Sequence, residues 1–135
     1  MNNDIDNLKK RLIYQKDYIT KDEMLKAHAN SKNSIIIAPA MHEGLDLKDD
    51  LSRFQIICKV PYPSFHENEQ LKIRMQLSQD YYNWLTALKL VQSYGRSIRS
   101  VDDWADTFVL DQDFVRFKRN CFKLLPKWFL EVIKS

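Results

Sequence analysis

The sequence predicts an α/β fold with a small, mostly parallel sheet that helices cover on both faces. Residues 34–38, 54–60 and 106–110 form short runs rich in β-branched and aromatic side chains, and stretches with helical spacing separate them. A continuous apolar run indicates a strand that is buried on both faces, as in parallel sheets. Strands that alternate with helices favour this fold class. With about three to five strands the sheet would be small, so a partner surface could complete it.

The N-terminal part of the chain contains weaker signals. Residues 4–11 are polar, with leucines at positions 8 and 12, which predicts a short helix, and residues 12–14 predict a brief strand. Thr20 and Glu23 have the spacing of a capping box, so we expect a helix from there through about Ala29.

The rest of the chain predicts further helices. Residues 66–91 contain neither proline nor glycine and predict one long helix or two shorter ones. After the third strand, an apolar stripe predicts an amphipathic helix; its members are Phe114, Phe117, Cys121 and Phe122. Pro126 ends this helix, and residues 128–133 predict a further apolar turn or short helix.

Composition limits the class of protein. The chain has 135 residues, 44% of them hydrophobic and 29% charged, which is ordinary for a single globular domain over 1–135. Its apolar runs fall short of the roughly 18 residues that span a bilayer, so we expect no membrane partner. Residues 1–6 lack the basic start and apolar core of a secretory signal, which favours a cytoplasmic location.

Metal and disulfide chemistry find little support. Cys58 and Cys121 are too few for a disulfide framework or a four-cysteine site, and each lies in an apolar stretch, so we expect reduced, buried thiols. His42 and Glu43 begin a pattern similar to the zinc motif His-Glu-x-x-His, but position 46 is aspartate and Gly44 disfavours the required helix. We therefore expect no metal site.

The glycine count excludes the common nucleotide cradles. Gly44 and Gly95 are the only glycines in the sequence. A phosphate-binding P-loop needs two glycines five positions apart followed by Lys and Ser or Thr, and the dinucleotide fingerprint needs three glycines. Any nucleotide is therefore not held by a glycine-rich loop of this chain. Both glycines adjoin predicted strands, and we expect them at the carboxyl edge of the sheet, where ligands bind.

The segment around Gly95 is suited to binding a polyphosphate. Arg96 and Arg99 are three positions apart, so on a helical turn they point the same way, and Gln92 lies one turn earlier. Two guanidinium groups and an amide can bind phosphate oxygens together, and Gly95 leaves room for a close approach. In the alternative interpretation, both arginines are solvated or pair with the acidic residues at 102–103.

Two segments carry a resemblance to a known family. Gln92-Ser-Tyr-Gly95-Arg96-Ser-Ile-Arg99 is similar to motif VI of superfamily 2 helicases, and Glu43-Gly44-Leu-Asp46-Leu resembles motif V of their XPD and DinG branch. The stretch 60–63, the tyrosine pair at 81–82 and the Leu-Asp at 110–111 also fit that branch. Order and spacing agree over about 34–111. The resemblance implies that residues 1–135 are most of a second, RecA-like motor domain, with motif V at 38–47 and motif VI at 92–99.

The resemblance also implies roles for individual residues. Arg96 and Arg99 would be arginine fingers that reach ATP across a cleft, and Gln92 would help to place the phosphate or the attacking water. Gly44, Asp46 and Gly95 would line the nucleotide, and Glu43 would couple it to the DNA side. The first motor domain would hold most contacts to ATP and magnesium and would carry the branch's iron–sulfur cluster, so we expect no cluster in this chain.

The function implied is ATP hydrolysis coupled to movement on single-stranded DNA, in DNA repair, with the first motor domain of the same helicase as partner. Without a P-loop, the isolated chain is expected to be inactive. The alternative is a non-enzymatic DNA-binding or protein-interaction module derived from a truncated helicase. An exposed sheet edge would also allow self-association.

Two further features have alternative interpretations. The last amphipathic helix carries five basic side chains, which would either contact a DNA backbone or form a solvated outer face; they are Arg116, Lys118, Arg119, Lys123 and Lys127. Three tryptophans could stack on bases, but their apolar neighbours favour core packing; they are Trp84, Trp104 and Trp128.

Overall fold

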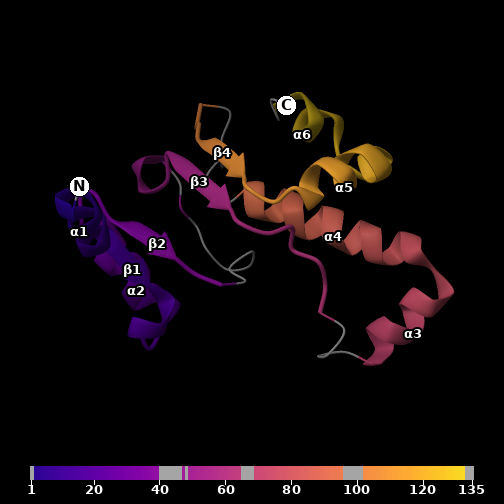
Figure 1. Cartoon of the computed structure of the whole chain (residues 1–135), viewed down its shortest axis with the longest axis horizontal. Helices are drawn as coiled ribbons and strands as arrows, with labels where there is room; N and C mark the ends of the chain where they lie inside the picture. The colour runs from indigo at the N-terminus through magenta and orange to yellow at the C-terminus, as the bar shows by residue number, and fades with distance from the viewer. Residues whose placement is uncertain (1, 40–46, 48, 65–68, 96–101, 133–135) are drawn as a thin grey trace. The chain divides into compact units, whose positions relative to one another are not determined.

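A computed structural model describes residues 2–39, 47, 49–64, 69–95 and 102–132. The chain divides into two compact units, Met1–Leu45 and Asp46–Ser135, each with its own elements (Figure 1). Parallel strands alternate with helices in both, which confirms the α/β class. The described residues contain four strands, divided between two sheets of two strands each. The single domain over 1–135 stays a prediction.

The first unit is a small βαβ arrangement. It contains α1 (Asn2–Arg11), β1 (Leu12–Tyr14), α2 (Lys21–Ala29) and β2 (Ile35–Ile37), with a 3-10 turn at Gln15–Asp17. β1 and β2 are parallel, with Leu12 opposite Ile35 and Tyr14 opposite Ile37.

The capping box at the start of α2 is confirmed. The Glu23 backbone N–H donates to Thr20 Oγ1 over 3.2 Å, and the Thr20 N–H donates to the Glu23 carboxylate over 3.2 Å. These two bonds satisfy backbone donors that a helix start leaves unpaired. One turn on, Met24 is fully buried.

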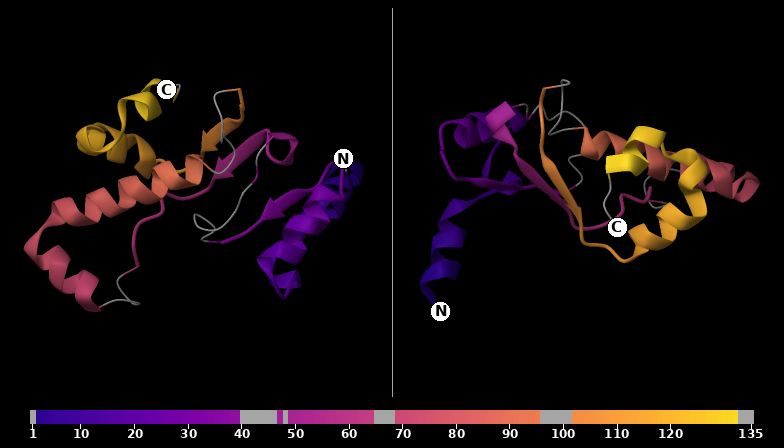
Figure 2. Two further views of the ribbon diagram at one scale, coloured as in Figure 1. Left: turned by 180° about the vertical axis from the view of Figure 1, so that it is seen from behind. Right: turned by 90° about the horizontal axis from the view of Figure 1, so that it is seen from above.

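The second unit contains β3 (Phe54–Ile57), α3 (Glu69–Leu77), α4 (Gln79–Tyr94), β4 (Asp106–Val109), α5 (Asp113–Cys121) and α6 (Lys127–Val132), with 3-10 turns at Asp49–Leu51 and Phe122–Leu124. β3 and β4 are parallel, with Phe54 opposite Asp106 and Ile57 opposite Val109. The expected helical region is two helices that separate at Ser78, whose extended φ of −159° breaks the helical path. α4 is the crossover that makes the parallel pair possible, and it runs back along the strands (Figure 2).

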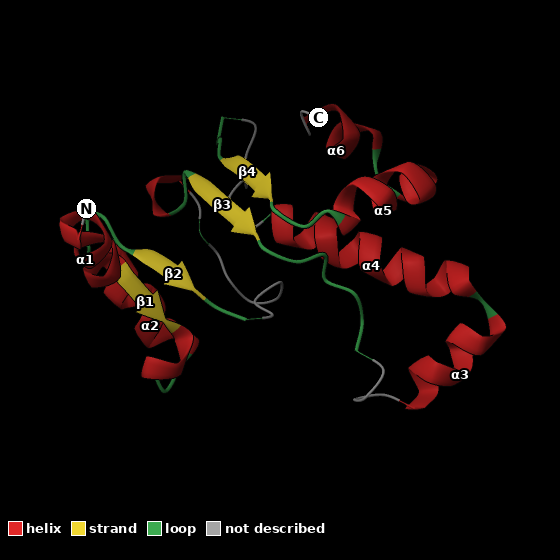
Figure 3. Ribbon diagram, viewed as in Figure 1, coloured by secondary structure: helices red, strands yellow, loops and turns green. Residues whose placement is uncertain are grey.

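The core of the second unit lies between the inner face of the β3–β4 sheet and helices α4, α5 and α6 (Figure 3). Its buried members are Val60, Ala87, Leu90, Phe114, Phe117, Cys121, Leu125 and Phe129, and Ile57 and Val109 of the strands pack against them. The predicted apolar stripe of α5 is therefore confirmed at three of its four positions. Phe122 is the exception at 52% exposure, because α5 ends at Cys121 and the following 3-10 turn rotates Phe122 outward.

The expectation that strands are buried on both faces is wrong for the outer face of the β3–β4 sheet. Phe54, Ile56 and Phe108 are each about half exposed, and Leu110 beyond β4 is 67% exposed. Ile37 at the end of β2 is also exposed, at 42%. Among the described residues, the helices that pack on the β3–β4 sheet lie on its other face, so alternate side chains of both strands point away from the core.

The same alternation explains the cysteines. Cys58 follows Phe54 and Ile56 at even spacing and is exposed, so the prediction that it is buried is wrong. Cys121 is buried against the core as predicted, and burial raises the pKa of its thiol. The prediction of core tryptophans is also wrong, since Trp84, Trp104 and Trp128 are 46%, 58% and 48% exposed. Within the described ranges, no helix combines the length and apolar character that crossing a membrane requires.

Phe129 provides a test of the core. It is 1% exposed, and its ring meets the Tyr94 ring edge-on with centroids 5.4 Å apart. Phe129→Ala should lower the free energy of unfolding by about 3–5 kcal/mol, because it removes a large buried ring and leaves a cavity. Phe122→Ala, which truncates an exposed ring, should cost less than about 1 kcal/mol. Urea denaturation followed by circular dichroism measures both, and equal losses would contradict this core.

Candidate functional site

The candidate site lies where α4 ends and where β3 and β4 begin. Gln92 and Gly95 of the predicted site are described there. The other predicted site residues lie outside the described residues; they are Glu43, Gly44, Asp46, Arg96 and Arg99. The site is therefore built from the residues on both sides of segment 96–101, which connects α4 to Asp102.

Gln92 and Gly95 belong to the last turn of α4. Gln92 is partly buried, and Gly95 caps the helix with its N–H donating to the Val91 carbonyl over 3.1 Å. Gly95 has φ −69° and ψ 5°, a conformation open to any residue. A Cβ there would lie 3.6 Å from the Val91 carbonyl oxygen and 3.8 Å from that of Gln92, which are ordinary contacts. The end of α4 therefore does not itself require glycine.

The prediction that Gly95 lies at the carboxyl edge of the sheet is wrong. Gln55, the second residue of β3, donates from Nε2 to the carbonyl of Tyr94 over 3.2 Å. This contact places the end of α4 beside the amino ends of the strands, not the carboxyl ends. The reason is geometric: a helix that connects two parallel strands runs opposite to them, so its C-terminus returns to the edge where the next strand begins.

Arg53, immediately before β3, is the centre of a polar cluster at this edge. Its Nη1 donates to Asp103 Oδ1 over 2.9 Å and to the Trp104 carbonyl over 3.0 Å. Its Nε and Nη2 both donate to Asp50 Oδ1, over 3.1 and 2.9 Å. The guanidinium carbon lies 5.0 Å from the centre of the Trp104 ring. The hydrogen bond and charge of Asp50, and after them those of Asp103, raise the pKa of Arg53, so it stays charged.

The two carboxylates that Arg53 bridges differ in exposure. The Asp103 side chain is 2% exposed, whereas that of Asp50 is 97% exposed. Burying a carboxylate is costly unless a charged partner binds it, so the Asp103 contact is the one that matters for stability. From the sequence, Asp103 is a candidate partner for Arg96 or Arg99. The structure gives it a partner in Arg53, beside the strand, and the predicted pairing with Arg96 or Arg99 lies outside the described residues.

Sequence reasoning missed Arg53 and Gln55. The sequence feature that could have revealed them is their position at the start of an otherwise apolar strand. A polar side chain at such a position needs hydrogen-bond partners. Gln55 has them in the Tyr94 carbonyl and in Thr107 Oγ1, which lies 2.9 Å from its Nε2.

The carboxyl edge of the same sheet is fixed by Asp111. Its Oδ2 accepts from the Val60 N–H over 2.9 Å, and its Oδ1 accepts from the Asp113 N–H over 3.2 Å. Lys59 Nζ lies 3.8 Å from Oδ1. The hydrogen bond from Val60, then that from Asp113 and the positive charges of Lys59 and Arg116, hold the pKa of Asp111 below its ordinary value. Asp111 thus ties the end of β3 to the start of α5.

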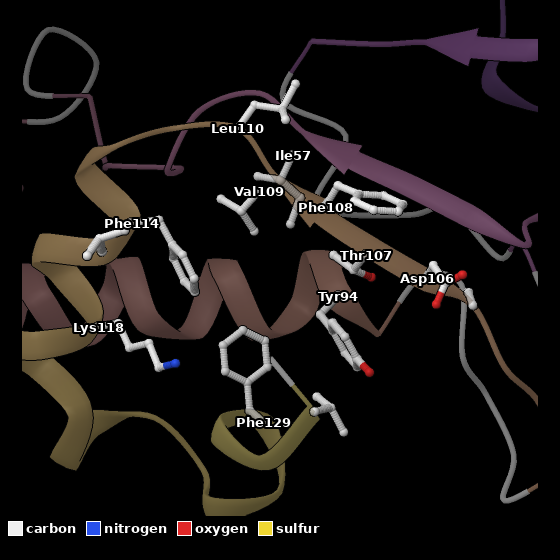
Figure 4. A pocket seen from close by; sticks show the side chains of 13 residues that line it. Ile57, Tyr94, Asp106, Thr107, Phe108, Val109, Leu110, Phe114, Lys118 and Phe129 are labelled. Carbon is white, nitrogen blue, oxygen red and sulfur yellow. The ribbon is translucent and has the colours of Figure 1, made fainter. Parts of the chain in front are cut away.

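A hollow of about 460 Å³ lies along β4 and is bounded by α5 and α6 (Figure 4). Its walls are mostly apolar, with Phe108, Val109 and Phe129 among them, and Lys118 is the cation in the lining. Such a lining does not suit a polyphosphate, which needs several converging donors. Among the described residues, no group of three His, Cys, Asp or Glu side chains could hold a metal ion.

Comparison with known families decides the class. The family model described as helicase C-terminal domain matches residues 1–132, nearly the whole chain. The chain belongs to this family. The match covers both glycine-bearing segments and every element described above, and it agrees with the resemblance to the XPD and DinG branch.

Individual relatives carry helicase names. The chain is 25% identical over 156 aligned positions to "ATP-dependent DNA helicase CHL1" of Saccharomyces cerevisiae, an alignment that covers 97% of the chain and 17% of the relative. It is 29% identical to the Schizosaccharomyces pombe protein "ATP-dependent DNA helicase chl1", over 74% of the chain and 13% of the relative. It is also 29% identical to the "Regulator of telomere elongation helicase 1 homolog" of Caenorhabditis elegans, over 67% of the chain and 10% of the relative. The chain therefore spans between a tenth and a fifth of these relatives.

The lowered pKa of Asp111 predicts how stability depends on pH. A carboxyl whose pKa is depressed by folding stabilises the folded state above its ordinary pKa of 3.8 and loses this contribution as pH falls through its folded pKa. Wild-type stability should therefore fall as pH drops below about 3.8, toward the lowered pKa of the folded state. Asp111→Asn should be less stable at pH 7 and show a shallower fall. Asn120→Gln, an uncharged substitution at an exposed position of α5, is the control and should keep the wild-type slope. Denaturation across this pH range measures it.

Gly95→Ala tests whether the fold needs this glycine. The φ of Gly95 and the ordinary contacts that a Cβ would make there predict stability that is unchanged or raised by up to about 1 kcal/mol, because alanine restricts the unfolded chain. Thermal and urea denaturation measure the effect. A loss larger than about 1 kcal/mol would show that the glycine has a structural role after all.

Proposed function

We propose that this chain is the second motor domain of an ATP-dependent DNA helicase, which couples ATP hydrolysis to movement on single-stranded DNA. The observation that carries the proposal is the family match over 1–132, which includes the motif V segment at 38–47 and the motif VI segment at 92–99. The helicase names of the relatives support it. Because the chain spans at most a fifth of the relatives cited above, the complete activity would require a first motor domain.

Arg96 and Arg99 would be the arginine fingers of this reaction. When the terminal phosphoryl group is transferred, negative charge spreads over its oxygens, and a guanidinium group placed there stabilises the transition state. Gln92, in the last turn of α4, would orient the phosphate or the attacking water. These side chains would act on a nucleotide that another domain holds, so the rule that ligands bind at the carboxyl edge of a sheet does not govern them.

Gly95 supports this proposal because the fold does not require a glycine at this position. Neither its φ nor its surroundings among the described residues require a missing side chain. A glycine without a conformational reason is explained if another group approaches the backbone closely. In the proposed motor that group is the nucleotide.

The remaining assignments follow from the motif V segment. Gly44 and Asp46 would line the nucleotide, and Glu43 would couple this side to the bound DNA. ATP and magnesium would be held mainly by the first motor domain, which would also carry any iron–sulfur cluster, and this chain alone would be inactive. A cytoplasmic location and a role in DNA repair stay predictions from the sequence.

A second candidate is a non-enzymatic DNA-binding module. The observation that favours it is the exposure of four basic side chains from α5 onward; they are Arg116, Arg119, Lys123 and Lys127. Lysine and arginine side chains that contact phosphates give binding that weakens steeply with salt. This candidate predicts DNA binding without any effect of Arg96 or Arg99 on ATP turnover.

Reconstitution tests the proposal. This chain is mixed with the N-terminal motor half of the Saccharomyces cerevisiae relative, and DNA-stimulated ATP hydrolysis is measured. We expect turnover in the mixture and none with the chain alone. Arg96→Ala and Arg99→Ala should each lower kcat by roughly a thousandfold, the effect of arginine fingers in related reactions. Gly95→Ala should also lower kcat, while its stability is maintained.

Arg74→Ala is the matched control for these variants. Arg74 is an exposed arginine on α3, outside motif V, motif VI and the basic side chains from α5 onward, and its Nη1 donates to the Tyr81 hydroxyl over 3.2 Å. Its loss should leave kcat within about twofold of wild type, since exposed surface contacts contribute little. No turnover in a mixture whose two parts are folded and associated would reject the motor domain and favour the DNA-binding module.

A further inference from the structure

We infer that Arg53 and Gln55, at the start of β3, are positioning residues for the arginine-bearing segment 96–101. The inference rests on the proposed function, because it assigns these residues to the same site. Neither residue belongs to motif V or motif VI. Their hydrogen bonds hold the chain on both sides of this segment, at Tyr94 before it and at Asp103 and Trp104 after it.

Gln55 fixes the side that precedes the segment. Its side chain lies on the inner face of the sheet, beside the apolar side chains of Ile57 and Val109. Nε2 donates to the Tyr94 carbonyl over 3.2 Å and to Thr107 Oγ1 over 2.9 Å. Carbonyls in the last turn of a helix lack partners within the helix, so this bond both caps α4 and holds its end against the strand. The position of Gly95 is thereby set by β3.

Arg53 fixes the side that follows the segment. The Nη1 bonds to the Asp103 carboxylate and to the Trp104 carbonyl use one arm of the guanidinium, and the Asp50 bonds use the rest of it. Asp103 in turn accepts from the Trp104 N–H over 2.9 Å. A planar fork with several directed bonds defines position more strictly than a lysine ammonium does. Arg53 therefore holds the backbone at Trp104 as well as the carboxylate.

The register of the sheet makes the two anchors act together. Arg53 and Gln55 are alternate residues of one extended segment, and the Arg53 carbonyl accepts from the Asp106 N–H over 3.0 Å. Tyr94, before segment 96–101, and Asp103 and Trp104, after it, are thus bonded to one extended segment. Arginine fingers depend on position to within about 1 Å, and a displacement of that size costs on the order of a hundredfold in rate. Loss of an anchor should reduce kcat through Arg96 and Arg99, with no contact between the anchor and ATP.

Kinetics of the reconstituted complex test this role. Arg53→Lys keeps the charge and removes the fork, and Gln55→Leu removes the amide with little change in volume. Each should lower kcat roughly tenfold to a hundredfold. Arg74→Lys, the same substitution at an exposed arginine on α3 that has no part in the proposed DNA or nucleotide contacts, should change kcat less than about twofold. A kcat for Arg53→Lys equal to wild type would overturn the inference.

A double-mutant cycle separates positioning from general damage to the fold. If Arg53 acts through the arginine fingers, Arg53→Lys should have little further effect in a chain that already carries Arg96→Lys. Equal fold losses in both backgrounds would mean a structural role only and would overturn the inference. If Arg96→Lys and Arg99→Lys themselves leave kcat unchanged, the proposed function fails. If they lower kcat and the Arg53 and Gln55 variants do not, the proposed function stands and the inference fails.

Amide hydrogen exchange on the chain alone gives an answer that does not depend on ATP or on a partner. Arg53→Lys should speed exchange at Trp104, and Gln55→Leu should speed it at Gly95, each by roughly tenfold, while exchange in α5 stays unchanged. Arg74→Lys should leave both amides unchanged. Exchange at Trp104 and Gly95 that equals wild type in both anchor variants would overturn the inference.

Discussion

The parallel pairing of β3 with β4 is the constraint on which the second unit depends. Two parallel neighbours need a connection that crosses from the end of one strand back to the start of the next. Here α4 makes most of that return, and its buried side chains Ala87 and Leu90 hold it against the inner face of the sheet. Thr86, also buried, satisfies its hydroxyl by donating to the Tyr82 carbonyl over 2.9 Å. The end of α4 lies at the amino edge as a consequence of this topology.

Polar side chains then fix the two edges of a sheet whose middle is apolar. At the amino edge Gln55 and Arg53 bind the chain around segment 96–101, and at the carboxyl edge Asp111 binds the Val60 and Asp113 backbones. Between them, Ile57 and Val109 pack on the helical core. A buried polar group left without its partner costs about 1–3 kcal/mol, so each of these contacts favours one arrangement of the chain over its competitors. Apolar contacts alone would hold the helices in place less specifically.

Features that depend on neighbours in sequence could be predicted, and features that depend on distant partners could not. The capping box of Thr20 and Glu23, the four strands and the buried stripe of α5 follow from spacing within a few residues. The exposure of Trp104 and Cys58 does not, because it depends on which face of the sheet the helices cover. The Arg53–Asp103 pair joins residues fifty positions apart, which no local pattern reveals. Of the predicted site, Gln92 and Gly95 are the residues that the structure describes. The edge on which Gly95 lies was predicted wrongly, because it depends on the direction of the crossover helix.

The arrangement of the described residues favours a domain that contributes side chains to a phosphate site held mainly by another domain, over a domain that contains the whole site. The hollow along β4 is mostly apolar, and the glycine count excludes a glycine-rich phosphate loop within the chain. At the amino edge, polar contacts instead lie on either side of a segment with two arginines. Fixing the flanks of a charged segment to a strand suits charges that must meet a phosphate group held by another domain, because such charges act only when they are accurately placed. The small share of its relatives that the chain spans agrees with such a division of the site between two domains. Arg53 and Gln55, at the start of β3, would then contribute to catalysis by positioning the arginines of motif VI, without contacting the nucleotide themselves.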